Sequence, residues 1–305
     1  MVLKKSFVIA IVASACVVTL SACSLPFTHA SSATPTISVT STPTISESPS
    51  QSPSPSPSLQ ITTYPMYYFA DTQQGLRLYR EWHKVSEVKP ADVGLASLQR
   101  LVNAGEEPFD SDYKSAWTSG STVNSIKHVG PLAIVDITIG THTGTGLGAE
   151  GEQRAIDQLV WTLTANDKSV RSVKFTSGGK VIETFAGHVD TKGTFARENG
   201  YEVLASVWIN VPGQVDGKTP WTLKNPVVIS GTACVMEAAV PWELVKDGKV
   251  VKSDMTLASE SCPTQAPWKV SLGTLQPGTY VFKAKDLSAE DGSIVSEDTK
   301  TFVVE

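Results

Sequence analysis

The chain has 305 residues, of which 41% are hydrophobic and 18% are charged, and its formal net charge is −5 at pH 7. This length is enough for two folded domains in addition to any targeting segment. The acidic balance argues against a nucleic-acid-binding protein, and no cationic run points to a surface for anionic lipid headgroups.

The first residues have the layout of a bacterial secretory signal. Lys4 and Lys5 precede an apolar run that is too short and wrongly flanked for a membrane span. The run ends in Leu20-Ser21-Ala22-Cys23, which resembles the bacterial lipobox, whose cysteine carries lipid (palmitate among the acyl chains) and becomes the first mature residue. We therefore predict a signal peptide over 1–22 and a lipid on Cys23 that anchors the protein at the outer face of the cell membrane. The alternative is an ordinary signal peptide with an incidental cysteine.

The next segment is predicted to be a disordered stalk. Ser, Thr and Pro fill 25 of the 37 positions in 24–60, and Glu47 supplies the one charge. Such a composition has too little apolar surface to offset the entropy cost of ordering. Residues 23–60 are therefore interpreted as the lipidated cysteine followed by a Ser/Thr/Pro-rich stalk, extended by its prolines.

Residues 61–190 are predicted to form an α+β domain. An aromatic β-rich run over 63–71 and a second run over 76–85 favour a hairpin. A helix is expected from Pro90, a favourable first-turn residue, to Gly105. Further hairpins are expected at the turns Gly130-Pro131 and Gly178-Gly179, and between them lies a helix with the apolar stripe Ile156, Leu159, Val160 and Leu163. This order predicts two helices packed on one mainly antiparallel sheet.

The loop before the second helix matches a dinucleotide fingerprint. Gly144, Gly146 and Ala149 spell G-x-G-x-x-A between a predicted strand and a helix. A dinucleotide fold also needs an acidic residue at the end of the next strand, and this strand lacks one. Glu150 and Glu152 in the first helical turn would repel a bound phosphate. We therefore expect a pliant glycine loop, with no nucleotide and no other cofactor.

Five segments of this domain resemble the GerMN domain of sporulation and spore-germination proteins. The resemblance covers most of 64–187 and implies the fold without implying any chemistry. The family often has a proline where this chain has Trp117. The five segments are PADVGLASLQRLVNAG (90–105), YKSAW (113–117), LAIVDIT (132–138), GEQRAIDQLVWTLT (151–164) and VRSVKF (170–175).

Residues 200–305 are predicted to form an all-β domain. About seven short strands, separated by glycine, proline and Asp-Gly turns, fit an immunoglobulin-like sandwich. Residues 225–251 and 278–304 resemble the immunoglobulin-like domain that often follows GerMN in bacterial surface proteins. Trp242 and Trp268 share strand faces with aliphatic residues and are expected in the core.

Cys16 is expected to leave with the leader and Cys23 to carry the lipid, so Cys234 and Cys262 are the cysteines left to pair. Both lie in one small β domain outside the reducing cytoplasm, so a disulfide between them is predicted, with two separate buried thiols as the alternative. Two cysteines and scattered histidines lack a zinc ligand set, so no metal is expected.

Trp208 is the candidate interaction residue. In the strand around it, Val203, Ala205, Val207, Ile209 and Val211 are expected to face the sandwich core. Side chains alternate along a strand, so Trp208 should point the other way. Trp208 either packs against the first domain or the linker, fixing the angle between the domains, or is an exposed anchor for a partner, since tryptophan is enriched at binding hot spots.

Two patterns raise the question of an enzyme. Ser86-x-x-Lys89 and Ser111-x-x-Lys114 match the S-x-x-K of penicillin-binding enzymes, but the companion S-D-N and K-T-G motifs do not occur. Glu106-Glu107 and the Glu150/Glu152 pair could be glycosidase carboxylates, but solvated helix-end and loop charges explain them better. No catalytic residue is therefore predicted.

The sequence indicates a non-enzymatic, membrane-anchored cell-envelope lipoprotein. Its expected role is protein–protein interaction or assembly in the wall space, and the family resemblance implies a link to sporulation or germination. The alternative is a module that binds peptidoglycan or another wall glycan.

Overall fold

The computed structural model describes residues 60–103, 106–117, 120–140, 148–213 and 219–305, which all fall in one structural unit, Ser54–Glu305. The predicted signal peptide, Cys23, nearly all of the predicted stalk, and Gly144 and Gly146 lie outside the described residues. Across the described ranges, no helix has the length and apolar character needed to cross a membrane.

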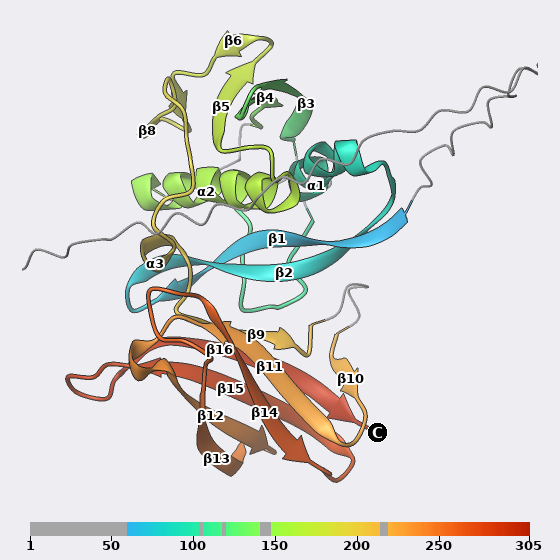
Figure 1. Cartoon of the computed structure of the whole chain (residues 1–305), viewed down its shortest axis with the longest axis vertical. Coiled ribbons are helices and arrows are strands. Elements are labelled where there is room, and N and C mark those ends of the chain that lie inside the picture. The colour runs from blue at the N-terminus through green and yellow to red at the C-terminus, as the bar shows by residue number, and fades with distance from the viewer. Residues whose placement is uncertain (1–59, 104–105, 118–119, 141–147, 214–218) are drawn as a thin grey trace, which may run out of the picture. The chain divides into compact units, whose positions relative to one another are not determined.

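The first domain begins with the predicted hairpin (Figure 1), formed by β1 (Gln60–Thr72) and β2 (Gly75–Val88). The turn between them needs Gly75, whose φ is +88°, a conformation that side chains with a Cβ disfavour. Met66, Tyr67, Tyr68 and Phe69 are consecutive and all buried, so β1 is covered on both faces. This explains why its sequence is apolar and aromatic throughout.

The remaining sheet of this domain has the order β3-β4-β5-β6 and contains one parallel pair. Strands β4 and β5 run parallel because α2 crosses between them, whereas the other neighbours are antiparallel. The predicted mainly antiparallel sheet with two helices is present, but the β1–β2 hairpin forms a sheet of its own. The elements are η1 (Pro90–Asp92), α1 (Val93–Val102), β3 (Thr122–Val129), β4 (Leu132–Thr138), α2 (Gly148–Asn166), β5 (Ser172–Ser177) and β6 (Lys180–Val181).

Helix α2 lies between the hairpin and the sheet (Figure 1). Its Trp161 ring lies 5.6 Å from the ring of Tyr67 in β1, while Ile156 and Leu159 line one small apolar cavity with Phe175 of β5. All four residues of the predicted apolar stripe are buried. The first predicted helix is a 3-10 turn followed by α1 and ends at Val102, earlier than expected. The domain closes with β7 (Thr184–Phe185), β8 (Val189–Asp190) and α3 (Gly200–Val203).

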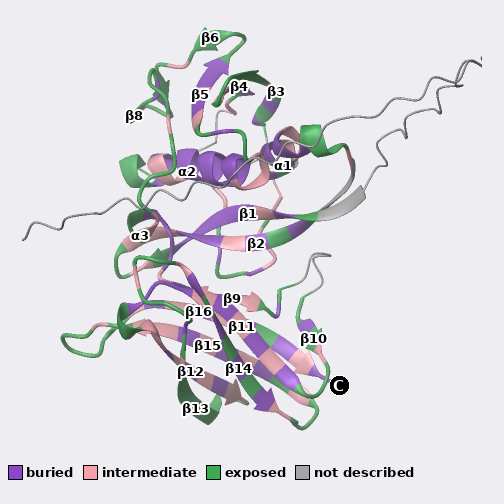
Figure 2. Ribbon diagram, in the orientation of Figure 1, coloured by how far each residue is buried: buried purple, intermediate pink, exposed green. Residues whose placement is uncertain are grey.

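The second domain is the predicted sandwich, in which buried and exposed residues alternate along the strands (Figure 2). A five-stranded sheet, ordered β10-β16-β15-β12-β13, packs on a three-stranded sheet, ordered β14-β11-β9. Trp242 and Trp268 lie in its core and stack on Phe282 at ring distances of 5.5 and 6.2 Å, as expected. The elements are β9 (Val207–Val211), β10 (Trp221–Leu223), β11 (Val227–Ala233), η2 (Met236–Ala238), β12 (Ala239–Lys246), β13 (Lys249–Leu257), β14 (Ala266–Gly273), β15 (Gly278–Leu287) and β16 (Ile294–Val304).

The inward-facing set predicted around Trp208 is correct in its centre and wrong at its ends. Val207 and Ile209 belong to the sandwich core. Val203 and Ala205 instead join the core of the first domain, because the chain there forms α3 and a turn before β9 begins. Val211 is 40% exposed at the end of β9.

A disulfide joins Cys234, just after β11, to Cys262, in the loop before β14. The two Cα atoms are 4.5 Å apart, and the bridge spans 28 residues of sequence. It links the end of β11 to the loop that leads into its neighbouring strand β14.

Replacing Cys234 and Cys262 together by alanine should lower the free energy of unfolding of this domain by roughly 3–4 kcal/mol, because a loop of this length is no longer closed in the unfolded chain. Urea denaturation followed by tryptophan fluorescence measures the loss. Reductant should lower the midpoint of the parent protein and leave the double variant unchanged. A parent protein that is insensitive to reductant and alkylated at both cysteines would contradict the bridge.

Candidate functional site

A buried charged cluster lies where a loop of the first domain meets the last strand of the second. Ser296, Asp298 and Lys300 follow the same alternation along β16 as the core residue Phe302, and all are buried. The first-domain loop over 106–117 covers them, and its Phe109 packs against the sandwich core. Polar side chains thus fill the part of this sheet face that contacts the first domain.

Lys300 is the centre of the cluster. Its ammonium group pairs with the Asp110 carboxylate, donates to the Tyr113 hydroxyl at 2.9 Å and lies 3.6 Å from Asp298 Oδ1. The Tyr113 hydroxyl donates to Asp298 Oδ1 at 2.7 Å, and the Ile209 N–H donates to Asp298 Oδ2 at 2.5 Å. Hydrogen bonds from three different segments therefore converge on these carboxylates.

Burial and charge act in opposite directions on the pKa values of this cluster. The pKa of Asp298 is raised to about 7, because burial and the nearby Asp110 raise it by more than Lys300 and its hydrogen bonds lower it. Burial likewise raises the pKa of Asp110 against the effect of Lys300. Burial alone would lower the pKa of Lys300, but Asp298 and Asp110 outweigh it and raise that pKa. The ammonium group of Lys300 thus faces the carboxyl groups of Asp110 and Asp298. Because its pKa is raised, Asp298 stays protonated to a higher pH than an ordinary aspartate.

A second buried network positions the start of the same loop. His83, fully buried, contacts Glu81 through Nε2 at 2.9 Å and Glu106 through Nδ1 at 3.2 Å. Burial lowers the pKa of His83, but its bonds to Glu106 and Glu81 outweigh burial and raise it. The Glu81 carboxylate also accepts the N–H groups of Phe109 and Asp110, each at 2.9 Å. Glu81 therefore holds the backbone that presents Asp110 to Lys300.

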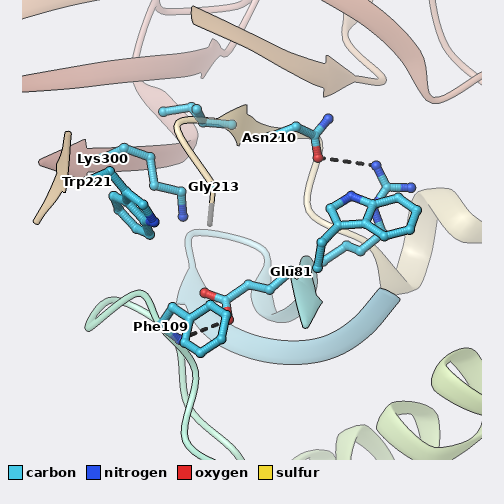
Figure 3. A pocket seen from close by; sticks show the side chains of 9 residues that line it. Glu81, Phe109, Asn210, Gly213, Trp221 and Lys300 are labelled. Atoms are coloured by element: carbon cyan, nitrogen blue, oxygen red, sulfur yellow. Dashed lines mark hydrogen bonds between the residues drawn. The ribbon is translucent and has the colours of Figure 1, made fainter. Parts of the chain in front are cut away.

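Figure 3 shows the pocket enclosed by these groups, with Glu81, Phe109, Trp221 and Lys300 around it. Among the described residues that line it, Arg80 Nε and Trp221 Nε1 are buried and have no hydrogen-bond partner. A neighbouring hollow of about 350 Å³ is lined by aromatic, hydroxyl and acidic residues. In the described ranges, no group of three or more His, Cys, Asp or Glu side chains is placed to hold a metal ion.

Trp208 is 2% exposed, so the hypothesis of an exposed anchor at this residue is wrong. The ring belongs to the core of the first domain, although its neighbours on β9 face the sandwich. Its Nε1 donates to Asn210 Oδ1 at 3.2 Å, and the same oxygen accepts from Arg80 Nη2 at 3.2 Å. The Arg80 guanidinium lies 5.7 Å from the ring centre. Trp208 therefore packs against the first domain, and its role in fixing the angle between the domains stays a prediction.

Two of the glutamates interpreted as solvated charges, Glu106 and Glu152, have structural partners instead, whereas Glu150 is exposed as expected. Glu106 forms an ion pair with Arg100 at 2.6 Å besides its bond to His83. Glu152 is buried and accepts the His188 N–H at 2.9 Å, and Glu150 accepts the Leu76 N–H at 2.7 Å. Because these residues bind local backbone and basic groups, they do not form a facing pair of catalytic carboxylates. Glu107 is exposed, as expected.

The S-x-x-K patterns end at ordinary surface residues. Lys114 forms an exposed ion pair with Asp71 at 2.8 Å, and Ser111 is exposed in the loop. An exposed ion pair of this kind does not activate a serine nucleophile.

The sequence interpretation missed Asp110, Asp298 and Lys300. One signal was available: in SEDTKTFVV (296–304), the polar residues Ser296, Asp298 and Lys300 share the parity of Phe302 and Val304. A strand whose polar residues continue its buried face indicates a covered polar interface.

Two family models match the chain, one over each of the two domains. Residues 65–183 match the family described as "Germane: Sporulation and spore germination", and residues 207–293 match "Gmad2: Immunoglobulin-like domain of bacterial spore germination". The chain is a tandem of these two domain types. The expected GerMN-type domain followed by an immunoglobulin-like domain is therefore confirmed.

Parts of the chain are also similar to solved structures. The chain is similar to the tandem GerMN domains of the sporulation protein GerM from Bacillus subtilis (19% identity, TM-score 0.35, covering 45% of this chain and 47% of that one), and so spans about half of that chain. It is also similar to a "Putative Lipoprotein from Clostridium perfringens" (15% identity, TM-score 0.32, 46% and 89% covered). A third similar structure is CopC from Methylosinus trichosporium OB3b (21% identity, TM-score 0.22, 28% and 82% covered). No curated protein matches the chain.

The substitution Lys300→Met should lower the free energy of unfolding by roughly 3–5 kcal/mol, because it leaves two buried carboxylates without their cation. Lys283→Met is the matched control: Lys283 forms a partly exposed pair with Glu297 at 3.3 Å on the neighbouring strand, and its loss should cost less than about 1 kcal/mol. Chemical denaturation compares the two. Similar small losses would show that the cluster does not hold the domains together.

The pH dependence of the free energy of unfolding should reflect the titration of Asp298. An unfolded aspartate releases its proton near pH 4, whereas folded Asp298 keeps it up to about pH 7. Between these values the folded state binds more protons, so this residue makes the free energy of unfolding fall as pH rises. Denaturation at pH 4, 5.5 and 7 should show that fall in the parent protein relative to Asp298→Asn. A difference between the two proteins that stays constant with pH would contradict this assignment.

Proposed function

We propose that this chain is a non-enzymatic lipoprotein, anchored by a lipid on Cys23 to the outer face of the cell membrane, whose two domains bind another envelope protein in the wall space. The observation that carries the proposal is the leader ending in Leu20-Ser21-Ala22-Cys23, placed ahead of a polar stalk and two spore-germination domain types. In this proposal the leader directs export and anchoring, and the extended stalk places the folded domains away from the membrane. The tandem supplies the link to sporulation or germination.

The arrangement of charges favours binding over catalysis. Lys300, Asp110, His83 and Glu81 are buried at the junction, and all are engaged with one another or with backbone. A catalytic acid or base must instead reach a substrate atom. These groups therefore serve to hold the two domains in a defined arrangement, which suits a module that presents a fixed surface.

One feature supports the alternative, a module that binds peptidoglycan or another wall glycan. The hollow of about 350 Å³ beside the junction is lined by Phe109, Trp221, Asp112, Thr299 and Thr301, among others. Aromatic faces, hydroxyl groups and a carboxylate are the groups with which proteins contact sugars. Crosslinking in intact cells, followed by purification, should capture an envelope protein under the main proposal. Co-sedimentation of the purified protein with peptidoglycan, lost in Asp112→Ala, would favour the alternative.

The substitution Cys23→Ala should release the protein from the membrane fraction or leave the leader uncleaved, because the acyl acceptor is gone. Cell fractionation and the mobility of the protein on a gel measure both outcomes. Cys16→Ala is the matched control, since Cys16 lies inside the apolar run and is expected to leave with the leader. Normal processing and membrane retention of Cys23→Ala would overturn the proposed anchor.

A further inference from the structure

Strand β13 is an edge of the five-stranded sheet and carries much exposed apolar surface. None of its nine residues is buried. Of the twelve large hydrophobic residues that are exposed among the described ones, four lie on this strand: Val250, Val251, Met255 and Leu257. An exposed edge strand with apolar side chains is a template for pairing with another strand.

The register with β12 identifies the free backbone groups of β13. Pro241 lies opposite Met255 and has no N–H to donate, which suits a pair without ladder hydrogen bonds. Just beyond β13, the Ala258 N–H donates to the Ala238 carbonyl at 2.8 Å, as the alternation requires. The N–H and C=O groups of Ser253 and Met255 therefore point to the open edge. There the Met255 N–H donates to the carboxylate of its neighbour Asp254 at 2.8 Å.

We propose that β13 pairs with β13 of a second copy of this chain, antiparallel and centred on Ser253. Charge complementarity selects this occupant and this register. With Ser253 on the two-fold axis, Lys252 lies opposite Asp254 of the partner subunit, and the same ion pair recurs on the other side. Val251 lies opposite Met255 of the partner subunit, so apolar side chains cover each other twice. Registers centred on Val251 or Met255 lose both ion pairs.

The groups already on the strand can make these contacts. Val251 has no partner in β12, because the register shifts between Leu244 and Val245. On pairing, the Met255 N–H donates to the backbone of the partner subunit, which frees the Asp254 carboxylate to accept from Lys252 of the partner subunit. Lys252 Nζ donates to the Leu272 carbonyl at 2.9 Å and has two further N–H groups available. Because a two-fold axis closes the pairing, assembly stops at two copies. The same two charges disfavour other registers, which protects the edge from open-ended association.

The test is disulfide crosslinking of the full-length protein in intact cells. Paired residues on neighbouring strands have Cα atoms about 5.5 Å apart, within the range of a disulfide. The variant Ser253→Cys should therefore yield a disulfide-linked dimer on a non-reducing gel. Val250→Cys is the matched control: it is exposed on the same strand but lies opposite Thr256 of the partner subunit, so its dimer yield should be at least tenfold lower. Equal yields at both positions, or no dimer at Ser253→Cys, would overturn the proposal.

Charge reversal distinguishes pairing in the proposed register from nonspecific association of the strand. In the Ser253→Cys protein, Lys252→Asp should abolish the crosslink, because it places acidic groups opposite one another twice. Adding Asp254→Lys should restore it, which would also show that the variants fold. Failure of the double reversal to restore the dimer, or capture of a different protein at this cysteine, would rule out self-pairing. Membrane fractionation of the same cells tests the proposed anchor separately, because the pairing does not depend on it.

Discussion

The arrangement of this protein depends on one buried ammonium group. Lys300 comes from the last strand of the immunoglobulin-like domain, Asp110 from a loop of the first domain, and Asp298 from the same strand as Lys300. A buried charge without a partner is costly, so each group requires the others. The two domains therefore share an electrostatic constraint as well as an apolar contact.

Strand β2 of the first domain positions the loop that carries Asp110. The Asp110 loop has no regular secondary structure, yet Glu81 on β2 accepts two of its N–H groups and His83 stacks on Phe109 at 4.0 Å. Tyr79 on the same strand stacks on Tyr113 at 4.6 Å. A single hairpin strand thus fixes the loop through alternate side chains. Trp208 makes the reverse contact, from the second domain into the core of the first.

This organisation leaves the outer surface of the sandwich for recognition. The polar groups at the junction are engaged internally, whereas β13 exposes both apolar side chains and backbone groups. Under the proposed lipid anchor and stalk, such an edge could reach a partner without any rearrangement of the folded part. The physical distinction is between buried charges that fix geometry and exposed strand groups that remain free to pair.

The local patterns of the sequence predicted much of the fold. The two β-rich runs over 63–71 and 76–85 predicted the β1–β2 hairpin, the stripe from Ile156 to Leu163 predicted α2, and the spacing of short strands predicted the sandwich. These features depend on residues that are near one another in the chain, so a single sequence contains the information. The family resemblance rested on the same core positions.

The sequence by itself determined the elements, their order and the two domain types. Tertiary structure decided which faces of those elements meet. The parallel pairing of β4 and β5, the burial of Trp208 in the first domain and the pairing of Asp110 with Lys300 join residues far apart in the chain. An aspartate in a polar loop has the same local pattern whether it is solvated or buried against a lysine 190 positions later. Its environment is set by the approach of a distant segment, because burial and charge pairing are properties of the folded assembly.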